Sequence, residues 1–366
     1  MRHRVLILTA SVGEGHDLPA RTLAAQLRRE RPDVEVVVED CLPAMGSVVA
    51  AFSAGAPGVV FYRFQWLWDL GFWFFARCGP TRTFTQLMLT RLSRPGIVRL
   101  IGNVDPSVIV SVYPNVTEVL GRLRASGSVG VPVVAAITDL AAMHYWATPG
   151  VDLHLITHAE SIPEVREVAG KDAMVQVVHG LTAPEFLEPR RQAEARRALG
   201  LPATGKVVLV SGGGWGVGDV EGATSAALEL DDVVQVVCLC GRNEDLRRRL
   251  LHRFGSNERV RIEGFTTQMP DWLSAADVLV HSTGGLTVLE AIMIGCPAIS
   301  YGWGRGHVRL NNRAFRRFGL ADVVSHRDEL KAAITRAFER RRDGSDEFSA
   351  LPSAASCVLA LVDGEA

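Results

Sequence analysis

The sequence predicts an α/β protein made of two Rossmann-like, doubly wound domains. A unit of apolar strand, glycine-rich turn and helix recurs along the chain, as in folds built from βαβ units. Its turns occupy residues 11–16, 211–216 and 282–285, so each half of the chain carries at least one. The chain has 366 residues, which is long for one hydrophobic core and sufficient for two.

Strands and helices alternate in both halves. In the first half we expect strands at residues 4–10, 34–39, 108–112, 132–137, 153–157 and 175–178, and helices at 20–31, 82–100 and 162–168. In the second half we expect strands at 207–210, 233–239, 260–265, 278–280 and 298–301, and helices at 246–253, 286–295, 313–317, 328–341 and 354–362. Between the two halves, two prolines and a run of charged residues interrupt this alternation of strands and helices. The predicted domains are therefore 1–181 and 191–366, joined by a linker at 182–190.

Composition excludes several classes of protein. A hydrophobic content of 48% favours a globular chain, and a net charge of −1 gives no field that would attract nucleic acid. The apolar run at residues 4–10 is short and leads into a glycine turn, so it is interpreted as a buried strand and not as a signal peptide. No run of 18 uncharged apolar residues predicts a membrane-spanning helix.

The six cysteines lack the spacing of a metal site. Cys238 and Cys240 are two residues apart in a predicted strand, so both side chains should face one side and pack there. Reduced thiols of this kind are typical of a cytoplasmic protein.

The turn at residues 282–285 is the strongest indication of a binding site. Glycines let a ligand approach the backbone, and the first amides of the following helix favour an anion such as phosphate. Glu290, about one and a half turns into that helix, can accept hydrogen bonds from a sugar diol. The alternative is an ordinary helix start followed by a solvated glutamate.

The spacing around this turn resembles the donor-nucleotide site of GT-B glycosyltransferases. TGGLTVLEA is followed by GCPAI, by Gly-His and by Asn-Asn, as in the group of monogalactosyldiacylglycerol synthase and peptidoglycan N-acetylglucosaminyltransferase. The resemblance implies the GT-B fold, with two domains facing an interdomain cleft. It implies donor binding by Thr283, Gly284, Gly285, Leu286, Thr287, Glu290, His307, Asn311 and Asn312. Gly-His-Val stands where relatives often have Gly-Gln-Glu, which leaves the transferred sugar open.

Other parts of the second domain extend the implied donor site. The turn at 211–216 faces the donor phosphates in relatives, which implies roles for Gly212, Gly213 and Gly214. Phe265 and Thr266 correspond to the backbone that binds the uracil edge. Arg242 follows a strand in a Gly-Arg-Asn turn, where it either contacts the nucleotide or belongs to a simple turn.

Catalytic candidates lie in the first domain. The group carries a glycine-rich loop that ends in Gly-His, here Gly15 and His16, which faces the acceptor. Glu14 can orient the imidazole or serve as base. Asp139 follows a strand end, where it is a second candidate for the base or a capping residue. The same resemblance implies acceptor contacts by His144 and Trp146.

The segment 58–80 is rich in aromatic side chains and includes Trp66, Trp68 and Trp73. It predicts either a buried helical hairpin or an interfacial patch that holds a lipid acceptor at a membrane surface. A flat soluble aglycone is a third possibility.

The predicted function is inverting transfer of a hexosyl group from a UDP-sugar to a hydroxyl of a lipid-like acceptor such as diacylglycerol. The resemblance implies no metal and no cofactor beyond the UDP-sugar, which is a substrate. It also implies a cytoplasmic protein, peripheral on the inner face of the membrane. The alternatives are a natural-product glycosyltransferase with a soluble aglycone, a UDP-sugar epimerase and a non-catalytic nucleotide-binding module.

Overall fold

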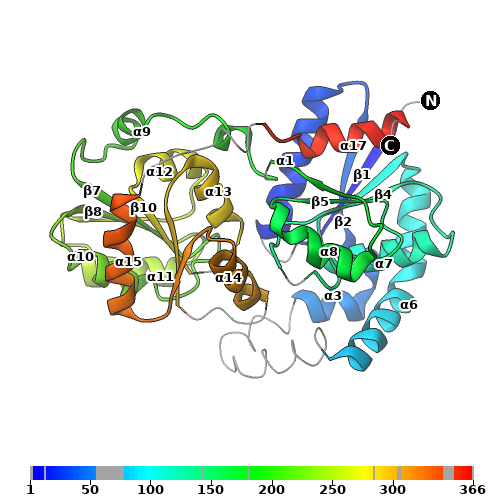
Figure 1. The fold of residues 1–366 in the computed structure, drawn as a ribbon, viewed down its shortest axis with the longest axis horizontal. Helices are drawn as coiled ribbons and strands as arrows, with labels where there is room; N and C mark the ends of the chain where they lie inside the picture. The colour runs from blue at the N-terminus through cyan, green and yellow to red at the C-terminus, as the bar shows by residue number, and fades with distance from the viewer. Residues whose placement is uncertain are drawn as a thin grey trace. The chain divides into compact units, whose positions relative to one another are not determined.

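The computed structural model describes residues 3–11, 14–54, 78–141, 143–179, 181–282, 285–302, 307–340 and 350–364. The chain divides into two compact units, each containing one six-stranded parallel sheet (Figure 1). Unit 1 comprises Met1–Thr182 with Ala350–Ala366, and unit 2 comprises Ala183–Ser349. The α/β fold expected from the repeated strand–turn–helix pattern is confirmed.

The sheet of unit 1 has the order β2-β1-β3-β4-β5-β6. Its strands are β1 (Arg4–Thr9), β2 (Glu35–Asp40), β3 (Val108–Ser111), β4 (Val133–Ala136), β5 (Leu153–Ile156) and β6 (Val175–Val177). The connections reverse direction between β1 and β3, because β2 and β3 lie on opposite sides of β1. In open parallel sheets, ligands bind beyond the carboxyl ends of the strands at such a switch point.

Helices cover both faces of this sheet, and the period-two alternation of the strands supplies both cores. In β1, Leu6 and Leu8 pack in one buried cluster, whereas Val5 and Ile7 pack in the other. The first cluster contains residues of α2 (Cys41–Met45), α3 (Ser47–Ala54), α6 (Gly79–Val104), α7 (Pro114–Ala125) and α8 (Ile162–Ala169). The second contains residues of α1 (Glu14–Glu30) and α17 (Ala354–Asp363).

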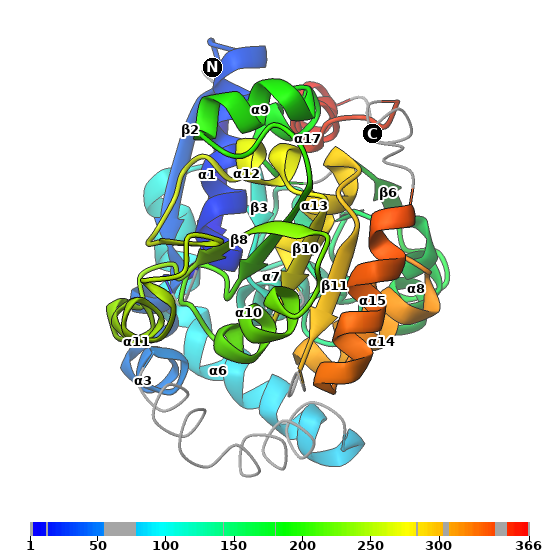
Figure 2. The same ribbon diagram turned by 90° about the vertical axis from the view of Figure 1, so that its left-hand side faces the viewer.

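The sheet of unit 2 has the order β12-β11-β10-β7-β8-β9 and reverses direction between β7 and β10. Figure 2 shows β8, β10 and β11 of this sheet. Its strands are β7 (Lys206–Ser211), β8 (Val233–Leu239), β9 (Val260–Glu263), β10 (Val278–His281), β11 (Ala298–Tyr301) and β12 (Asp322–Val324). One face packs against α10 (Val220–Leu228), α11 (Glu244–Phe254) and α15 (Arg327–Glu339). The described part of unit 2 also contains α9 (Gln192–Leu199), α12 (Met269–Ala275), α13 (Leu286–Ile294) and α14 (His307–Arg317). Short 3-10 turns are η2 (Ala159–Ser161) in unit 1 and η3 (Pro184–Phe186) in unit 2.

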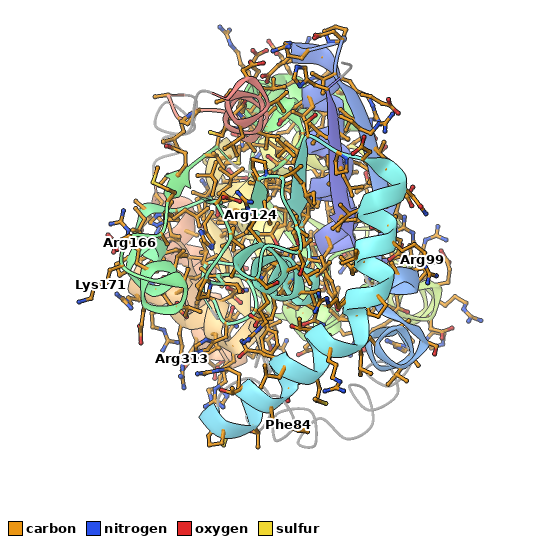
Figure 3. All side chains as sticks on the ribbon, turned by 90° about the vertical axis from the view of Figure 1, so that its right-hand side faces the viewer. Phe84, Arg99, Arg124, Arg166, Lys171 and Arg313 are labelled. Carbon is orange, nitrogen blue, oxygen red and sulfur yellow. The ribbon has the colours of Figure 1, made fainter. Side chains whose placement is uncertain are left out.

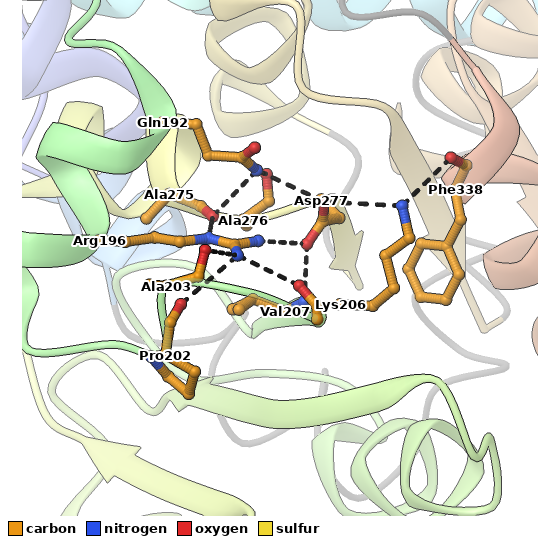
Figure 4. Close-up of polar contacts among 11 residues, drawn as sticks. Gln192, Arg196, Pro202, Ala203, Lys206, Val207, Ala275, Ala276, Asp277 and Phe338 are labelled. Carbon is orange, nitrogen blue, oxygen red and sulfur yellow. Dashed lines mark hydrogen bonds and ion pairs between the residues drawn. The ribbon is translucent and has the colours of Figure 1, made fainter.

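A buried ion pair joins the amino-terminal ends of β7 and β10 (Figure 4). The guanidinium of Arg196 contacts the Asp277 carboxylate at 2.6 Å and donates to the carbonyl oxygen of Ala275 at 3.0 Å. The same carboxylate accepts from the backbone amide of Val207 at 2.7 Å. The network therefore fixes the two strands at the edge opposite the switch-point loops. Removing one partner of such a buried ion pair destabilises the folded protein by about 3–5 kcal/mol.

The final helix corrects the predicted domain limits. Residues 191–366 were expected to form the second domain, but α17 packs on α1 and β3 in unit 1. Apolar residues of α17 such as Val358 and Leu359 pack in the core of unit 1. The local sequence gives this helix an apolar face but does not specify which sheet that face packs against. The predicted division near residue 182 agrees with the limit of unit 1, and η3 lies in the expected linker.

Helix starts also differ from the expected positions. Helix α1 begins at Glu14 and not at residue 20, although Gly15 and Pro19 both disfavour a helix there. Helix α14 begins at His307, six residues before the predicted start. Strand β12, with only three residues, was missed. The segment from residue 55 to residue 77, with the predicted aromatic patch, lies outside the described residues.

All six cysteines are free, and Cys238 and Cys240 are buried in one cluster, as their spacing predicted. In the described part of the chain, no helix has the length and apolar character needed to cross a membrane.

Candidate active site

Three loops meet at the carboxyl edge of the unit 2 sheet, after β7, β8 and β10. Gly216 and Gly218 adopt positive φ angles of 57° and 94°, which favour glycine. A Cβ on Gly216 would overlap the carbonyl oxygen of Cys240, and one on Gly218 would overlap the side chain of Ser282. Only glycine therefore allows the loop after β7 to approach both neighbouring loops so closely.

Hydrogen bonds fix these loops relative to one another. The amide of Arg242 donates to the carbonyl oxygen of Gly214 at 2.8 Å, and Asn243 Nδ2 donates to that of Gly216 at 3.1 Å. Ser211 Oγ accepts from the amide of Gly213 at 3.2 Å. The predicted residues Gly212, Gly213, Gly214 and Arg242 are thus brought together at the switch point.

The N-terminus of α13 lies in the third loop. Gly285 is its N-cap residue, and in the described part of the chain no side chain caps it. Leu286 and Thr287 are the first two helical residues, and their amides belong to the set that an α-helix leaves without an internal acceptor. Together with the helix dipole, such amides favour a phosphate or another anion.

Glu290 is buried in the second turn of the same helix, with 4% of its surface exposed. No residue in the described ranges donates a hydrogen bond to its carboxylate, and burial raises its pKa to about 8. Buried polar groups are usually paired. A polar ligand such as a ribose diol would supply donors to this carboxylate, and the ribose role implied by the resemblance stays a prediction.

A cation–aromatic pair lies beside these loops. The Arg242 guanidinium stacks over the Phe265 ring, with Cζ 3.9 Å from the ring centroid, and Phe265 remains 48% exposed. Thr266 Oγ1 accepts from the indole Nε1 of Trp272 at 3.2 Å, which fixes the turn after β9. An exposed, flat surface of this kind can stack against a nucleobase.

The remaining donor residues divide into two groups. Asn311 and Asn312 are buried in α14, and Asn312 Oδ1 accepts from Ser300 Oγ at 2.8 Å, so that residue joins the helix to β11. Thr283, Gly284 and the side chain of His307 lie outside the described residues, and their predicted roles stay predictions.

In unit 1, His16 lies at the switch point between β1 and β3. Its Nδ1 is 3.0 Å from the carbonyl oxygen of Val112, just after β3. Because a carbonyl only accepts, Nδ1 carries the hydrogen, and the neutral ring has its lone pair on Nε2. The Tyr113 ring meets the imidazole edge to face at 5.1 Å, and the Trp146 ring lies 5.9 Å away.

The loop after β4 brings two further predicted residues to this histidine. Trp146 is buried, with 1% of its surface exposed, and its indole Nε1 donates to Asp139 Oδ2 at 2.8 Å. His16, in α1, is thus connected to Trp146 and Asp139, which both lie in the loop after β4. The Asp139 carboxylate orients the indole against which the imidazole packs.

A second cluster of polar side chains also contacts the loop after β4. Nε2 of His144 contacts Nη1 of Arg82 at 2.8 Å, and Thr148 Oγ1 donates to Glu118 Oε2 at 2.9 Å. Tyr145 has a positive φ of 75°, which is unusual for a residue with a bulky side chain. Burial and the nearby Glu118 raise its pKa to about 12, so its phenol stays neutral.

Two residues of these clusters were not predicted from the sequence. Tyr113 was not singled out, although its place directly after the predicted strand 108–112 was a usable signal. Glu118 is a buried residue of α7, and its sequence context gives no such signal. Gly15 is exposed, and the side chain of Glu14 and the three tryptophans of the aromatic segment lie outside what the structure describes.

Two family models match the chain. Residues 16–180 match the model for monogalactosyldiacylglycerol (MGDG) synthase, and residues 220–339 match the model for glycosyl transferases group 1. The first range contains His16, Asp139 and Trp146, and the second contains Arg242, Phe265 and Glu290. The candidate residues of unit 1 and those of unit 2 therefore each fall within a range that matches a glycosyltransferase family model.

Known proteins resemble the chain over nearly all of its length. The processive diacylglycerol beta-glucosyltransferase of Bacillus subtilis is 26% identical over 344 residues, which cover 91% of this chain and 86% of that protein. MurG of Acinetobacter baumannii has the same fold, with a TM-score of 0.58, 16% identity and coverage of 99% of each chain. UGT71G1 of Medicago truncatula, solved with UDP-glucose, has a TM-score of 0.60, 13% identity and coverage of 100% of this chain and 98% of its own.

The motif resemblance and these matches agree. Glycosyltransferase domains in both halves favour glycosyl transfer over the alternatives of an epimerase and a non-catalytic module. The resemblance to the group of monogalactosyldiacylglycerol synthase and MurG is confirmed, and the protein is a glycosyltransferase with the GT-B fold.

Proposed function

We propose that this glycosyltransferase moves a hexosyl group from a UDP-sugar to a hydroxyl of diacylglycerol or a similar lipid, with inversion at the anomeric carbon. The observation that carries the proposal is the pair of switch-point sites. Unit 2 offers backbone amides that suit a diphosphate and, in the same helix, a buried carboxyl that suits a ribose diol. Unit 1 offers an imidazole whose tautomer is fixed by the backbone.

The donor assignment is supported by the chemistry of unit 2. Amides at the start of α13 and in the glycine loops suit a diphosphate, Glu290 suits a ribose diol, and the Arg242–Phe265 pair suits a base. Structural neighbours were solved with UDP-glucose and with thymidine diphosphate, so this fold accommodates nucleoside diphosphates of more than one base, and we propose uridine from the motif resemblance.

The lipid acceptor is supported by the relatives. The Bacillus subtilis protein that aligns with most of this chain is named for diacylglycerol, and the unit 1 match is to a synthase of a diacylglycerol glycolipid. The aromatic surroundings of His16, formed by Tyr113 and Trp146, suit an acceptor with an apolar body and one reactive hydroxyl.

The proposed chemistry is a single displacement. Nε2 of His16 takes the proton of the acceptor hydroxyl as its oxygen attacks the anomeric carbon, and the bond to the UDP oxygen breaks on the opposite side. The imidazolium keeps its Nδ1–H bond to Val112, and the Tyr113 and Trp146 rings stabilise its charge. Amides of unit 2 stabilise the departing diphosphate.

Asp139 is the second candidate for the base. Its carboxylate already accepts a hydrogen bond from Trp146, which favours a role in orienting that ring. If Asp139 were the base instead, Asp139→Asn would abolish turnover while His16→Gln would retain it.

The test is a turnover assay with a panel of donors. The purified protein is incubated with UDP-glucose, UDP-galactose and UDP-N-acetylglucosamine, together with diacylglycerol in detergent micelles. We expect UDP release that depends on the lipid, and a glycolipid product whose anomeric configuration by NMR is opposite to that of the donor.

Two results would contradict the proposal. UDP release at the same rate without lipid would indicate hydrolysis or another reaction of the donor. Faster turnover with soluble phenolic aglycones than with diacylglycerol would favour a natural-product glycosyltransferase.

A further inference from the structure

A buried carboxylate joins two helices of unit 1 to the loop after β4. Glu118 of α7 has only 2% of its surface exposed. Gln86 Nε2, from α6, donates to its Oε2 at 3.1 Å, and Arg122 Nε, one turn further along α7, donates to its Oε1. Thr148 Oγ1, in the loop after β4, donates to Oε2 at 2.9 Å. The carboxylate is therefore the common acceptor of side chains from α6, α7 and that loop.

The loop packs closely on α7 where this contact forms. A Cβ on Gly121 of α7 would lie 2.7 Å from Cγ2 of Thr148, and a Cβ on Gly150 would lie 2.3 Å from the carbonyl oxygen of Gly121. Thr148 is itself 2% exposed. Because a buried hydroxyl needs an acceptor within the protein, the bond to Glu118 fixes the position of this end of the loop.

Thr148 follows a tight turn that contains the indole of the acceptor site. The amides of Trp146 and Ala147 both donate to the carbonyl oxygen of Met143, at 3.0 and 2.7 Å. Tyr145, within this turn, has a φ of 75°. A bulky residue rarely adopts this conformation and keeps it where surrounding contacts hold the backbone.

The turn is bonded to a helix at each end. At its start, the amide of Met143 donates to Glu164 Oε1 of α8 at 3.2 Å. At its end, Thr148 donates to Glu118. Since a strained backbone relaxes when one of its attachments is released, loss of the second bond should move the indole that lies between the two ends.

We propose that Glu118 is a positioning residue of the acceptor site. Its carboxylate holds Thr148, and the turn before Thr148 then keeps the Trp146 ring 5.9 Å from the ring of His16, centroid to centroid. Glu118 acts through these residues and not by contact with a substrate. The inference rests on the proposed function for the role of His16 as base, but the position of the turn can be measured without any turnover.

A comparable ion pair elsewhere on α7 provides a structural control. Arg124, labelled in Figure 3, lies in the last turn of α7 and donates to both oxygens of Asp152, at 2.9 and 3.1 Å. The amide of Val133 donates to the same carboxylate at 2.8 Å. Asp152 directly precedes β5, and Val133 begins β4, so this pair lies at the amino-terminal edge of the sheet, opposite the switch point.

The test first changes the donor of the hydrogen bond. Thr148→Val removes the hydroxyl and keeps a branched side chain, whereas Thr148→Ser keeps the hydroxyl. With diacylglycerol in detergent micelles, Thr148→Val should lower kcat about fivefold, the effect of one hydrogen bond, and leave the KM for the UDP-sugar within twofold. Thr148→Ser and the control Asp152→Asn should each keep kcat within twofold of the wild type.

The acceptor of the same bond is changed next. Glu118→Met removes the carboxylate and keeps most of the side-chain volume, so a buried charge is not left without a partner. Both Glu118→Met and Thr148→Val break one and the same bond. The double variant should therefore have the kcat of Glu118→Met alone and not the product of the two losses.

Two measurements without substrate follow the turn directly. Amide exchange of a peptide that covers residues 143–148 should be about fivefold faster in Thr148→Val and unchanged in Asp152→Asn. In protein with ¹³C-labelled histidine, the His16 imidazole resonance, identified by its loss in His16→Gln, should shift in Thr148→Val, because the neighbouring indole moves.

Several results would overturn the positioning role. They are multiplicative losses in the double variant, an equal loss of kcat in Asp152→Asn or Thr148→Ser, and an unshifted His16 resonance in Thr148→Val. A shifted resonance and faster exchange in a protein whose wild type shows no turnover on diacylglycerol would instead support the positioning of the turn and count against the proposed function.

Discussion

The two units use parallel sheets of the same kind but build their sites from different atoms. At the switch point of unit 2, glycine backbones pack against one another, and amide groups form the surface that a ligand would meet. At the switch point of unit 1, an imidazole contacts a phenol edge to face and an indole at a tilt. The imidazole is bonded to a backbone carbonyl, and the indole is bonded to a carboxylate.

This difference follows from what each substrate offers. A diphosphate is recognised by many weak donors at once, which the backbone supplies without side-chain entropy. An acceptor hydroxyl needs one proton acceptor in the correct protonation state, which only a side chain supplies. Changes in unit 1 should therefore alter turnover, and changes in unit 2 should alter donor affinity.

Replacing His16 should give the largest effect. His16→Ala removes the proposed base, and kcat should fall about 10²- to 10⁴-fold, as expected when a general base is lost. Donor affinity, measured by calorimetry with UDP, should stay within twofold. The control His252→Ala changes an exposed histidine of α11 and should leave both quantities unchanged. A fully active His16→Ala enzyme would remove this residue from the chemistry.

Gly218→Val should lower donor affinity, whereas His16→Ala should lower kcat. The residue has a φ of 94°, and a Cβ there would overlap Ser282, so the loops after β7 and β10 must separate. Strain of 1–3 kcal/mol corresponds to a loss of roughly 10- to 100-fold in UDP affinity. Gly127→Val, at a φ of 71° in open space within unit 1, is the matched control. Equal losses in both variants would show that strain alone is responsible.

Glu290 predicts a pH dependence confined to unit 2. Because burial raises its pKa to about 8, most molecules carry the neutral acid at pH 7. A diol prefers the carboxylate, so UDP-sugar affinity should rise about tenfold between pH 7 and pH 9. Glu290→Gln should bind weakly and show no such rise. A parallel rise in the variant would assign the effect to another group.

The same carboxyl affects stability with a definite sign. Its pKa in the folded protein lies above the ordinary value of 4.5, so the folded state holds the proton more tightly. The resulting stabilisation is complete below about pH 4.5 and is lost as the pH rises through about 8. Relative to Glu290→Gln, the wild type should therefore lose thermal stability across that window, as differential scanning calorimetry can measure.

Trp146→Phe should give the smallest effect. The substitution keeps an aromatic ring beside His16 but removes the donor to Asp139. We expect a loss of less than tenfold in kcat, a changed pH profile of kcat/KM and unchanged UDP affinity, because the carboxylate no longer fixes the ring. Leu123→Val, a small change in the core of unit 1, controls for stability. An unaltered pH profile would show that the Asp139–Trp146 bond is only structural.

The two sites differ in how much of their geometry the local sequence contains. The glycine turn at 282–285 and Glu290 lie within a few residues of one another, so the local sequence places them together, whereas their donor-binding roles come from the resemblance. The contact between His16 and Val112 joins residues 96 positions apart, and it depends on the order of the strands. Local patterns do not specify that order, and for the same reason the packing of α17 on unit 1 was missed.

Hydrogen–deuterium exchange of the intact protein with and without UDP tests the central claim most directly. We predict that UDP slows exchange at the amides of residues 212–218 and 285–290, while the peptides that contain His16 and Val112 stay unchanged. Protection around His16 without protection of the unit 2 loops would contradict the assignment of the donor to backbone amides of unit 2.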